Sequence, residues 1–307
     1  MTERDRQAEI PRFGATAVAV IESLYQHHLL STRQAHRLHT PRRRRQAMQR
    51  TLARLRSGGL VDCVYLPGRH ALWYLTDHGI QAAEALPDRV ETRRKRIPRE
   101  HAAGPLQQHT IAVNDVGIAF VEAARARGDE CGPYAWRHEI AHPLGPLPGS
   151  RRPEQLIADA VLTYQLNEPE ETSFHYRFVE LDRANRATND LSRRLARYAR
   201  LYRHTARPTG KTGGAVALWT HLYPIFPTVL VVLAGQSRHR LERRRQTVLD
   251  LCRQEDDLLA NPQVHISICL LDDLAERGPF AAIFLTPEDP DEPTDWLGGQ
   301  PGDEAPR

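Results

Sequence analysis

The spacing of apolar residues in the first third of the chain predicts three helices followed by two strands. A first helix is indicated over residues 16–28, and a serine or threonine at 31–32 is a good N-cap for a short second helix. Pro41 stands where a proline can open a third helix, and two glycines at 58–59 end it. Two β-rich runs around a turn at 67–70 then predict a hairpin.

The predicted third helix has one apolar side and one basic side. Met48, Leu52 and Leu55 share the apolar side. Helix, helix, basic helix and hairpin is the order of a winged helix-turn-helix, whose third helix enters the major groove of DNA. Arginine and glutamine there bind guanine and adenine edges, and the hairpin tip reaches phosphate or the minor groove. A solvated arginine face, or one that docks an acidic protein, is the alternative. The residues expected to contact DNA are Arg42, Arg43, Arg45, Gln46, Gln49, Arg50, Arg54, Arg69 and His70.

Apolar patterning after residue 105 predicts a second domain in which helices and strands alternate. The run PTVLVVLAG at 227–235 is unbroken and indicates a strand buried on both faces. The order αβββαβαβ, with one further strand at the end, predicts an α/β sandwich with a mixed sheet. The elements are a helix at 109–127, strands at 134–140, 155–164 and 174–182, an arginine-rich helix to 203, the strand at 227–235, a basic helix at 238–253, and strands at 264–271 and 280–285.

Charge and proline content mark the segments that lie outside these two domains. The stretch before residue 106 is rich in proline and charge and has no apolar period, which is typical of a linker. The end of the chain is acidic and rich in proline and glycine, which favours disorder. The expected organisation is an N-terminal extension at 1–15, a winged helix-turn-helix at 16–86, a basic linker at 87–105, the α/β domain at 106–285 and an acidic disordered tail at 286–307.

Three carboxylates lie on the two strands before the arginine-rich helix. Glu180 and Asp182 are two residues apart and therefore share one face of their strand. Asp159 joins them if its strand is the neighbour. Three acids beside a basic helix suit a metal-and-phosphate site, but also a buried acid cluster neutralised by arginine. The candidate phosphate contacts on the helix are Arg193, Arg197 and Arg200.

The acids and the element order resemble those of the restriction-endonuclease-like fold of PD-(D/E)XK nucleases. The resemblance implies that Asp159 and Glu180 bind Mg²⁺. The hypothesis of an active endonuclease takes Asp159, Glu180 and Asp182 together as ligands of Mg²⁺ or Mn²⁺. In that family a lysine two residues after the second acid polarises the attacking water, and here Asp182 occupies its position. Ala158 also replaces the proline that precedes the family aspartate. Arginine stays protonated and cannot replace lysine as a base.

Short motifs along both domains resemble the replication-relaxation family. They are HTIAVNDV, ADAVL, VELDR and RYARLY, and the resemblance covers residues 16–285. It implies DNA binding in the replication or transfer of plasmids and mobile elements, without a settled chemistry. Members often carry a threonine and a lysine after the VELDR motif; Thr188 matches the first, and Arg194 stands near the second.

Composition and charge narrow the class of protein. The 307 residues are 40% hydrophobic and 26% charged, which fits two soluble domains. No apolar run approaches the length of a membrane span and the start carries no signal-peptide pattern. Four scattered cysteines without a CxxC pair favour a reducing cytoplasm. The first 100 residues hold 19 Lys and Arg against 10 Asp and Glu, which favours a polyanionic partner.

These observations support a DNA-binding protein of the bacterial cytoplasm, associated with the nucleoid or a plasmid. In this hypothesis the winged helix reads double-stranded DNA without a cofactor, and a degenerate nuclease-like domain supports it. The first alternative is an endonuclease or nickase that requires Mg²⁺ or Mn²⁺. The second is a protein-docking module of a replication or transfer complex. No membrane partner is expected, and a homodimer is left open.

Overall fold

The computed structural model describes residues 13–66, 70–86, 107–144, 154–206 and 215–298 of the chain. It divides into two compact units, Met1–Ile118 and Ala119–Arg307. The boundary falls inside helix α7 (Gln107–Arg127), whereas the sequence suggested a boundary before this helix. No helix of the described residues is long and apolar enough to cross a membrane.

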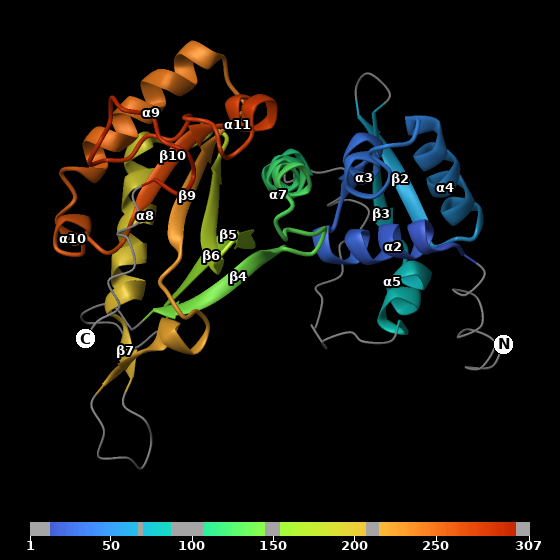
Figure 1. Ribbon diagram of the computed structural model, residues 1–307, viewed down its shortest axis with the longest axis horizontal. Coiled ribbons are helices and arrows are strands. Elements are labelled where there is room, and N and C mark those ends of the chain that lie inside the picture. Colours follow the sequence, from blue (N-terminus) through green and yellow to red (C-terminus); the bar gives the residue numbers. More distant parts are fainter. Residues whose placement is uncertain (1–12, 67–69, 87–106, 145–153, 207–214, 299–307) are drawn as a thin grey trace. The chain divides into compact units, whose positions relative to one another are not determined.

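The first unit packs helices on a small antiparallel sheet, as Figure 1 shows. Its strands lie in the order β1-β3-β2, and β2 and β3 form the predicted hairpin. The described elements, besides the first part of α7, are α2 (Ala15–His27), β1 (Leu30–Ser31), α3 (Thr32–His39), α4 (Arg45–Ser57), β2 (Val61–Leu66), β3 (His70–Leu75) and α5 (Asp77–Glu84).

Helix α3 begins at the predicted N-cap. The Ser31 hydroxyl accepts a hydrogen bond from the Gln34 backbone N–H at 3.1 Å, and the Gln34 side chain accepts one from the Ser31 N–H at 3.0 Å. This reciprocal pair is a capping box, and it satisfies two backbone donors at the start of the helix.

Helix α4 begins later than the sequence indicated. Its N-cap is Arg44, so Pro41 does not open the helix. The Arg43 N–H instead donates to the Thr40 carbonyl at 2.9 Å, which closes a turn before the helix. Two of the arginines predicted for the helix, Arg42 and Arg43, therefore lie in this turn.

The apolar side of α4 is the one that the sequence predicted. Met48, Leu52 and Leu55 are fully buried, while Arg50 and Arg54 between them are exposed. Burial of three large side chains on one stripe holds α4 against the unit and leaves its arginine side outward.

The first part of α7 is held within the first unit by hydrogen bonds to α3 and to the turn before it. Gln34 donates from Nε2 to the Ile111 carbonyl at 2.8 Å, and Asn114 donates from Nδ2 to the Leu29 carbonyl at 2.7 Å. Because Gln34 and Asn114 are both buried, these bonds satisfy polar groups that would otherwise be costly.

The second unit is built on a mixed five-stranded sheet in the order β10-β9-β6-β5-β4. Strands β4, β5 and β6 form an antiparallel meander, and β6, β9 and β10 run parallel. The described elements, after the second part of α7, are β4 (Trp136–Leu144), β5 (Glu154–Asn167), β6 (Thr172–Asp182), α8 (Thr188–Arg203), β7 (Thr205–Ala206), β8 (Val216–Ala217), the 3₁₀ helix η2 (Leu218–His221), β9 (Thr228–Leu233), α9 (Arg238–Cys252), α10 (Asp256–Leu259), β10 (Ile266–Leu270) and α11 (Leu271–Arg277).

Helices α8 and α9 cover one face of this sheet (Figure 1). Leu195 and Tyr198 of α8 join one core with Phe178 of β6 and Val231 of β9. Every residue of β9 is buried, which confirms the prediction from its unbroken apolar run. In a second cluster, the Phe120 ring of α7 forms T-shaped contacts with Tyr164 and Trp296, and the rings of Tyr164 and Trp296 also contact each other.

The last part of the described chain differs from the prediction in two ways. Residues 280–285, expected to form a strand, make only isolated bridges at Phe284 and Leu285. A short helix, α11, precedes them instead. Residues 286–298, expected to be disordered, pack on the second unit: Trp296 is 1% exposed, and its carbonyl accepts a hydrogen bond from Arg177 at 3.0 Å. The rest of the predicted tail lies outside the described residues.

Candidate functional site

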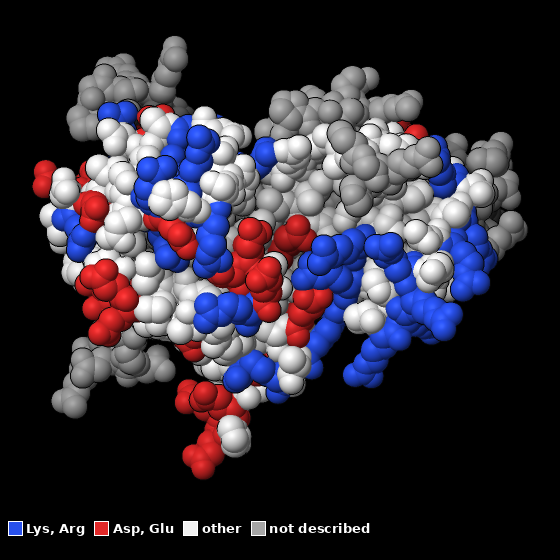
Figure 2. All heavy atoms as spheres, turned by 90° about the horizontal axis from the view of Figure 1, so that it is seen from above, with Lys and Arg blue, Asp and Glu red and all other residues white. Residues whose placement is uncertain are grey.

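The basic side of α4 is an exposed and unpaired surface. Each residue of the predicted set from Arg42 to Arg54 is exposed, and none of these arginines forms an ion pair within the described part of the chain. The neighbouring Arg56 differs, because it pairs with Asp62 of β2 at 3.0 Å. Figure 2 shows Lys and Arg side chains gathered on the half of the picture that holds this unit.

Several predicted contacts lie outside what the structure describes. Arg69 belongs to the undescribed tip of the β2–β3 hairpin, and His70 begins β3 without a described side chain. The basic linker predicted at 87–105 lies outside the described residues as well.

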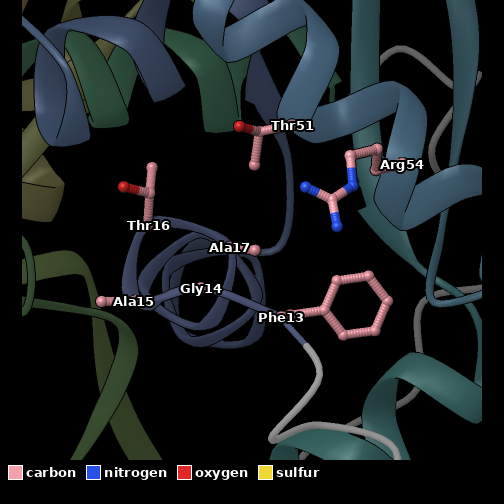
Figure 3. Close-up of a pocket in the computed structure, with 7 residues that line it drawn as sticks. All are labelled: Phe13, Gly14, Ala15, Thr16, Ala17, Thr51 and Arg54. Carbon is pink, nitrogen blue, oxygen red and sulfur yellow. The ribbon is translucent and has the colours of Figure 1, made fainter.

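Arg54 also lines a small pocket beside the start of α2. The pocket has a volume of about 170 Å³, and Figure 3 shows Thr51 and Arg54 of α4 facing Phe13 and the first residues of α2. Arg54 therefore lies where α4 adjoins α2, one turn of helix beyond Arg50.

Glu180 is the most enclosed of the three predicted acids. It is 2% exposed, on the face of β6 that α8 covers. Its Oε2 accepts a hydrogen bond from Arg194 Nε at 2.6 Å, and its Oε1 accepts one from the Tyr198 hydroxyl at 2.5 Å. Burial, with the nearby Asp159 charge, raises the pKa of Glu180 from 4.5 to about 7, although Arg194 opposes the shift.

Asp159 lies beside Glu180 at a break in the sheet. Its Oδ2 accepts a hydrogen bond from the Leu181 backbone N–H at 2.8 Å, and its Oδ1 accepts one from Arg194 Nη2 at 3.3 Å. The pairing of β4 with β5 is interrupted at Asp159 and at the opposite Glu139, which has a φ of 50°. The register is the same on both sides of this interruption, so neither strand carries an extra residue, and the Asp159 side chain bonds to β6 and α8.

Asp182 is held by a different arginine. Its Oδ2 accepts a hydrogen bond from Arg244 of α9, and its Oδ1 accepts one from the Ala184 N–H at 3.1 Å. Arg244 also donates to the Thr188 hydroxyl at 3.3 Å. The structure thus brings Asp159 and Glu180 together through Arg194, and it satisfies Asp182 separately.

Three arginines of α8 bind along the first part of β5. Arg194 donates to the Ile157 carbonyl at 2.9 Å and Arg197 to the Gln155 carbonyl at 2.7 Å. Arg197 and Arg200 also form ion pairs with Glu154, at 3.0 and 2.9 Å.

This stripe of arginines has a structural explanation. The pairing of β5 with β6 begins only at Ala160, so the carbonyls before it have no strand partner on that side. The arginines satisfy these groups at a spacing of three residues, which keeps them on one side of the helix. Of the predicted phosphate contacts, Arg197 and Arg200 are therefore engaged within the chain. Arg193 is 74% exposed and forms only a 3.5 Å ion pair with Asp190.

The three acids as arranged do not fit a divalent metal ion. Among the described residues, no group of three or more His, Cys, Asp and Glu side chains is placed to hold one. A protonated guanidinium already lies between Asp159 and Glu180. A cation such as Mg²⁺ would have to displace Arg194, and it would meet a Glu180 carboxyl whose raised pKa disfavours the charged, ligating form.

The Replication-relaxation family model matches residues 21–218, which is more than half of the chain. The chain belongs to the replication-relaxation family. Neither the comparison with curated proteins nor that with solved structures found a match. The matched region of this replication-relaxation protein includes α4, the acids and α8, but not β9 and α9. Membership suggests a role in the replication or transfer of plasmids and mobile elements.

The two arginines that organise the acids were not among the residues predicted for the site. In the sequence, Arg194 stands near the position of a family lysine and Arg244 is one of several arginines in a basic helix. One signal was available: Arg194 and Tyr198 are four residues apart and so lie on the same side of α8. A basic residue next to the apolar stripe of a helix is placed to meet an acid of the strand beneath it.

Proposed function

We propose that this protein binds double-stranded DNA in the replication or transfer of a plasmid or mobile element. The first unit would act as a winged helix-turn-helix, with α4 in the major groove and the β2–β3 hairpin as the wing. The element order α2-β1-α3-α4-β2-β3 and the three-stranded sheet support this assignment.

The observation that carries the proposal is the contrast between the arginines on the basic side of α4 and those of α8 and α9 that contact the sheet of the second unit. Arg194, Arg200 and Arg244 each bind a carboxylate of their own chain. Arg45, Arg50 and Arg54 on the basic side of α4 have no such partner in the described chain, whereas Arg56 of the same helix pairs with Asp62. A row of unpaired guanidinium groups on a helix is costly in self-repulsion, and DNA phosphates and guanine edges would relieve that repulsion.

We further propose that the second unit has a degenerate restriction-endonuclease-like fold. The order α7-β4-β5-β6-α8-β9, an antiparallel meander followed by a parallel strand, is the αβββαβ order of the resemblance. Asp159 and Glu180 take the acid positions, while Arg194 supplies the positive charge between them. In this proposal the acids stabilise the fold and DNA binding requires no cofactor.

The test is binding of a labelled duplex, measured by fluorescence anisotropy between about 50 and 200 mM salt. The Arg50→Ala/Arg54→Ala variant should lose sequence discrimination, because each bidentate base contact contributes about 1–3 kcal/mol. The control is Arg203→Ala/Arg253→Ala, which removes two exposed arginines from the C-terminal ends of α8 and α9. Wild-type affinity in the α4 variant would contradict the assignment, and a wild-type protein with no salt-dependent DNA affinity would favour the docking module.

The nuclease alternative is tested with supercoiled plasmid and Mg²⁺ or Mn²⁺, with wild type run beside Glu180→Gln. The glutamine keeps the shape of the side chain and removes the charge that a metal needs. We expect a mobility shift without cleavage in both proteins. Nicking or linearisation by wild type alone would establish the nuclease and overturn the structural role of the acids.

A further inference from the structure

A second group of arginines lies at the end of the sheet where the parallel strands β6 and β9 finish. We define it as the loop-end arginines: Arg186, Arg193, Arg240 and Arg243. All four are exposed. Arg186 belongs to the loop after β6, Arg193 to the second turn of α8, and the other two to the first turns of α9.

Contacts of the surrounding residues bring these segments together. Arg244 of α9 binds Asp182 at the end of β6 and Thr188 at the start of α8. On the other side of the loop, the Cα hydrogen of Gly235 points at the Arg183 carbonyl, since a Cβ there would lie 3.3 Å from its oxygen. The loop that holds Arg186 therefore lies beside the first turns of α8 and α9.

Helical spacing directs the α9 members toward that loop. Arg240 precedes Arg244 by four residues, so the two side chains share one side of the helix, and Arg243 is three residues from Arg240. Arg240 donates only to a neutral group, the Gln236 side chain, at 3.4 Å. Arg243 and Arg186 form no ion pair within the described part of the chain.

The carboxylates near the start of α9 and the end of β6 already pair with other arginines. Arg238, at the start of α9, pairs with Glu242 and Asp273, and Arg244 neutralises Asp182. Asp190 remains, with the weak 3.5 Å pair to Arg193. The segment 236–247 carries five arginines and one glutamate, so positive charge is in excess here. Figure 2 looks onto this end and shows Lys and Arg side chains gathered over the second unit, with carboxylates among them.

We infer that the loop-end arginines form a second DNA contact that binds the phosphate backbone of the duplex. The inference rests on the proposed function. In it the loop-end arginines, rather than Arg197 and Arg200, are the phosphate contacts of the second unit. Arginine binds phosphate oxygens through charge-assisted and often bidentate hydrogen bonds. The four loop-end arginines are exposed cations that come from three segments and form no row along one helix. We take this as an arrangement for contacts with the phosphate backbone rather than for reading base edges. Arg240 and Arg243 lie beyond the region that the family model matches.

The test compares Arg240→Ala/Arg243→Ala with the control Arg203→Ala/Arg253→Ala in the full chain. The first variant loses two arginines from the first turns of α9, whereas the control loses one at the C-terminal end of α8 and one directly after α9. The probe is a duplex titrated at several salt concentrations, once with specific and once with unrelated sequence. Circular dichroism of each variant checks that the fold is retained.

The Arg240/Arg243 variant should bind both duplexes about tenfold more weakly, and its salt slope should fall by about 2 in magnitude, since each phosphate contact contributes roughly 0.9. The control should bind like wild type. Equal losses in the two variants would mean that only net charge matters, and wild-type binding by both would mean that α9 does not touch DNA; either overturns the inference. If the Arg50→Ala/Arg54→Ala variant still loses discrimination in that case, the proposed function stands without it. If wild type binds no duplex at all, the proposed function fails first.

Discussion

Arg194 donates a 2.6 Å hydrogen bond from Nε to Oε2 of Glu180, across the interface between helix α8 and strand β6. The same guanidinium reaches Asp159 and the Ile157 carbonyl, so one side chain neutralises an acid pair and satisfies an unpaired strand. Together with the separate pair of Arg244 and Asp182, this relationship is the reason to expect that the three acids neutralise arginines rather than bind a metal ion. It also predicts how the loss of Arg194 or of Glu180 should change the stability of the protein.

Arg194→Ala should destabilise the second unit strongly. Removing one partner of a buried ion pair leaves the other charge without compensation, which typically costs about 3–5 kcal/mol. The free energy of unfolding, measured by urea denaturation at about pH 8 where Glu180 is mostly ionised, checks this. Arg193→Ala is the matched control, because the neighbouring side chain is 74% exposed and should change stability by less than about 0.5 kcal/mol. Equal effects of the two variants would contradict the role given to Arg194.

The stability of the protein should depend on pH through Glu180. Burial raises the pKa of this carboxyl to about 7 in the folded chain, above its ordinary 4.5. Between these two pKa values the folded state holds a proton that the unfolded chain has released. The stability that this group contributes is therefore complete below pH 4.5 and is lost as the pH rises through about 7. The pKa of Tyr198, its hydrogen-bond donor, is raised well above 10 by burial, so this hydroxyl stays protonated throughout.

Glu180→Gln should remove this part of the pH dependence. Because one pKa unit corresponds to about 1.4 kcal/mol, the difference between wild type and variant should change by on the order of 3 kcal/mol across that range. Thermal unfolding followed by circular dichroism at a series of pH values measures it. Glu170→Gln, at an exposed turn, controls for the loss of one carboxyl. Parallel curves for wild type and Glu180→Gln would show that Glu180 does not titrate there.

Mg²⁺ and Mn²⁺ should not stabilise the wild-type protein. A ligand that binds only the folded state at about 100 times its Kd adds about 2.7 kcal/mol, which is readily seen as a rise in Tm. With Arg194 between the carboxylates, we expect no such rise when either metal chloride is compared with an equal ionic strength of NaCl. A rise specific to Mn²⁺ or Mg²⁺ that Asp159→Asn abolishes would show that the metal displaces Arg194.

Trp296→Ala should destabilise the second unit although it lies in a segment with an acidic, proline-rich sequence. The indole is 1% exposed, and its ring contacts Phe120 and Arg177. Truncating a buried tryptophan costs about 3–5 kcal/mol. Leu222→Ala, at a side chain that is 57% exposed, is the control and should have little effect. A neutral Trp296→Ala variant would mean that residues 286–298 are dispensable for the fold.

Local patterns predicted the elements well where they reflect a repeating burial. The apolar stripe of α4, the unbroken run of β9 and the Ser31 cap each appear in the structure because helix, strand and cap depend on residues close in sequence. The start of α4 and the end of the chain were predicted wrongly. Thr40 closes a turn that competes with the helix at Pro41, and the buried Trp296 overrides a composition that favours disorder.

The sequence by itself determined the order of helices and strands up to β10, the basic side of α4 and the shared face of Glu180 and Asp182. These follow from the periods of helix and strand, which composition and spacing record directly. Only the tertiary structure decided which arginine meets which acid. Arg194 and Glu180 are 14 residues apart, and Arg244 and Asp182 are 62 apart, so their pairing depends on how α8 and α9 pack on the sheet. Ion pairs between elements arise from that packing, and no local pattern distinguishes an arginine that will bind a carboxylate of its own chain from one that stays exposed.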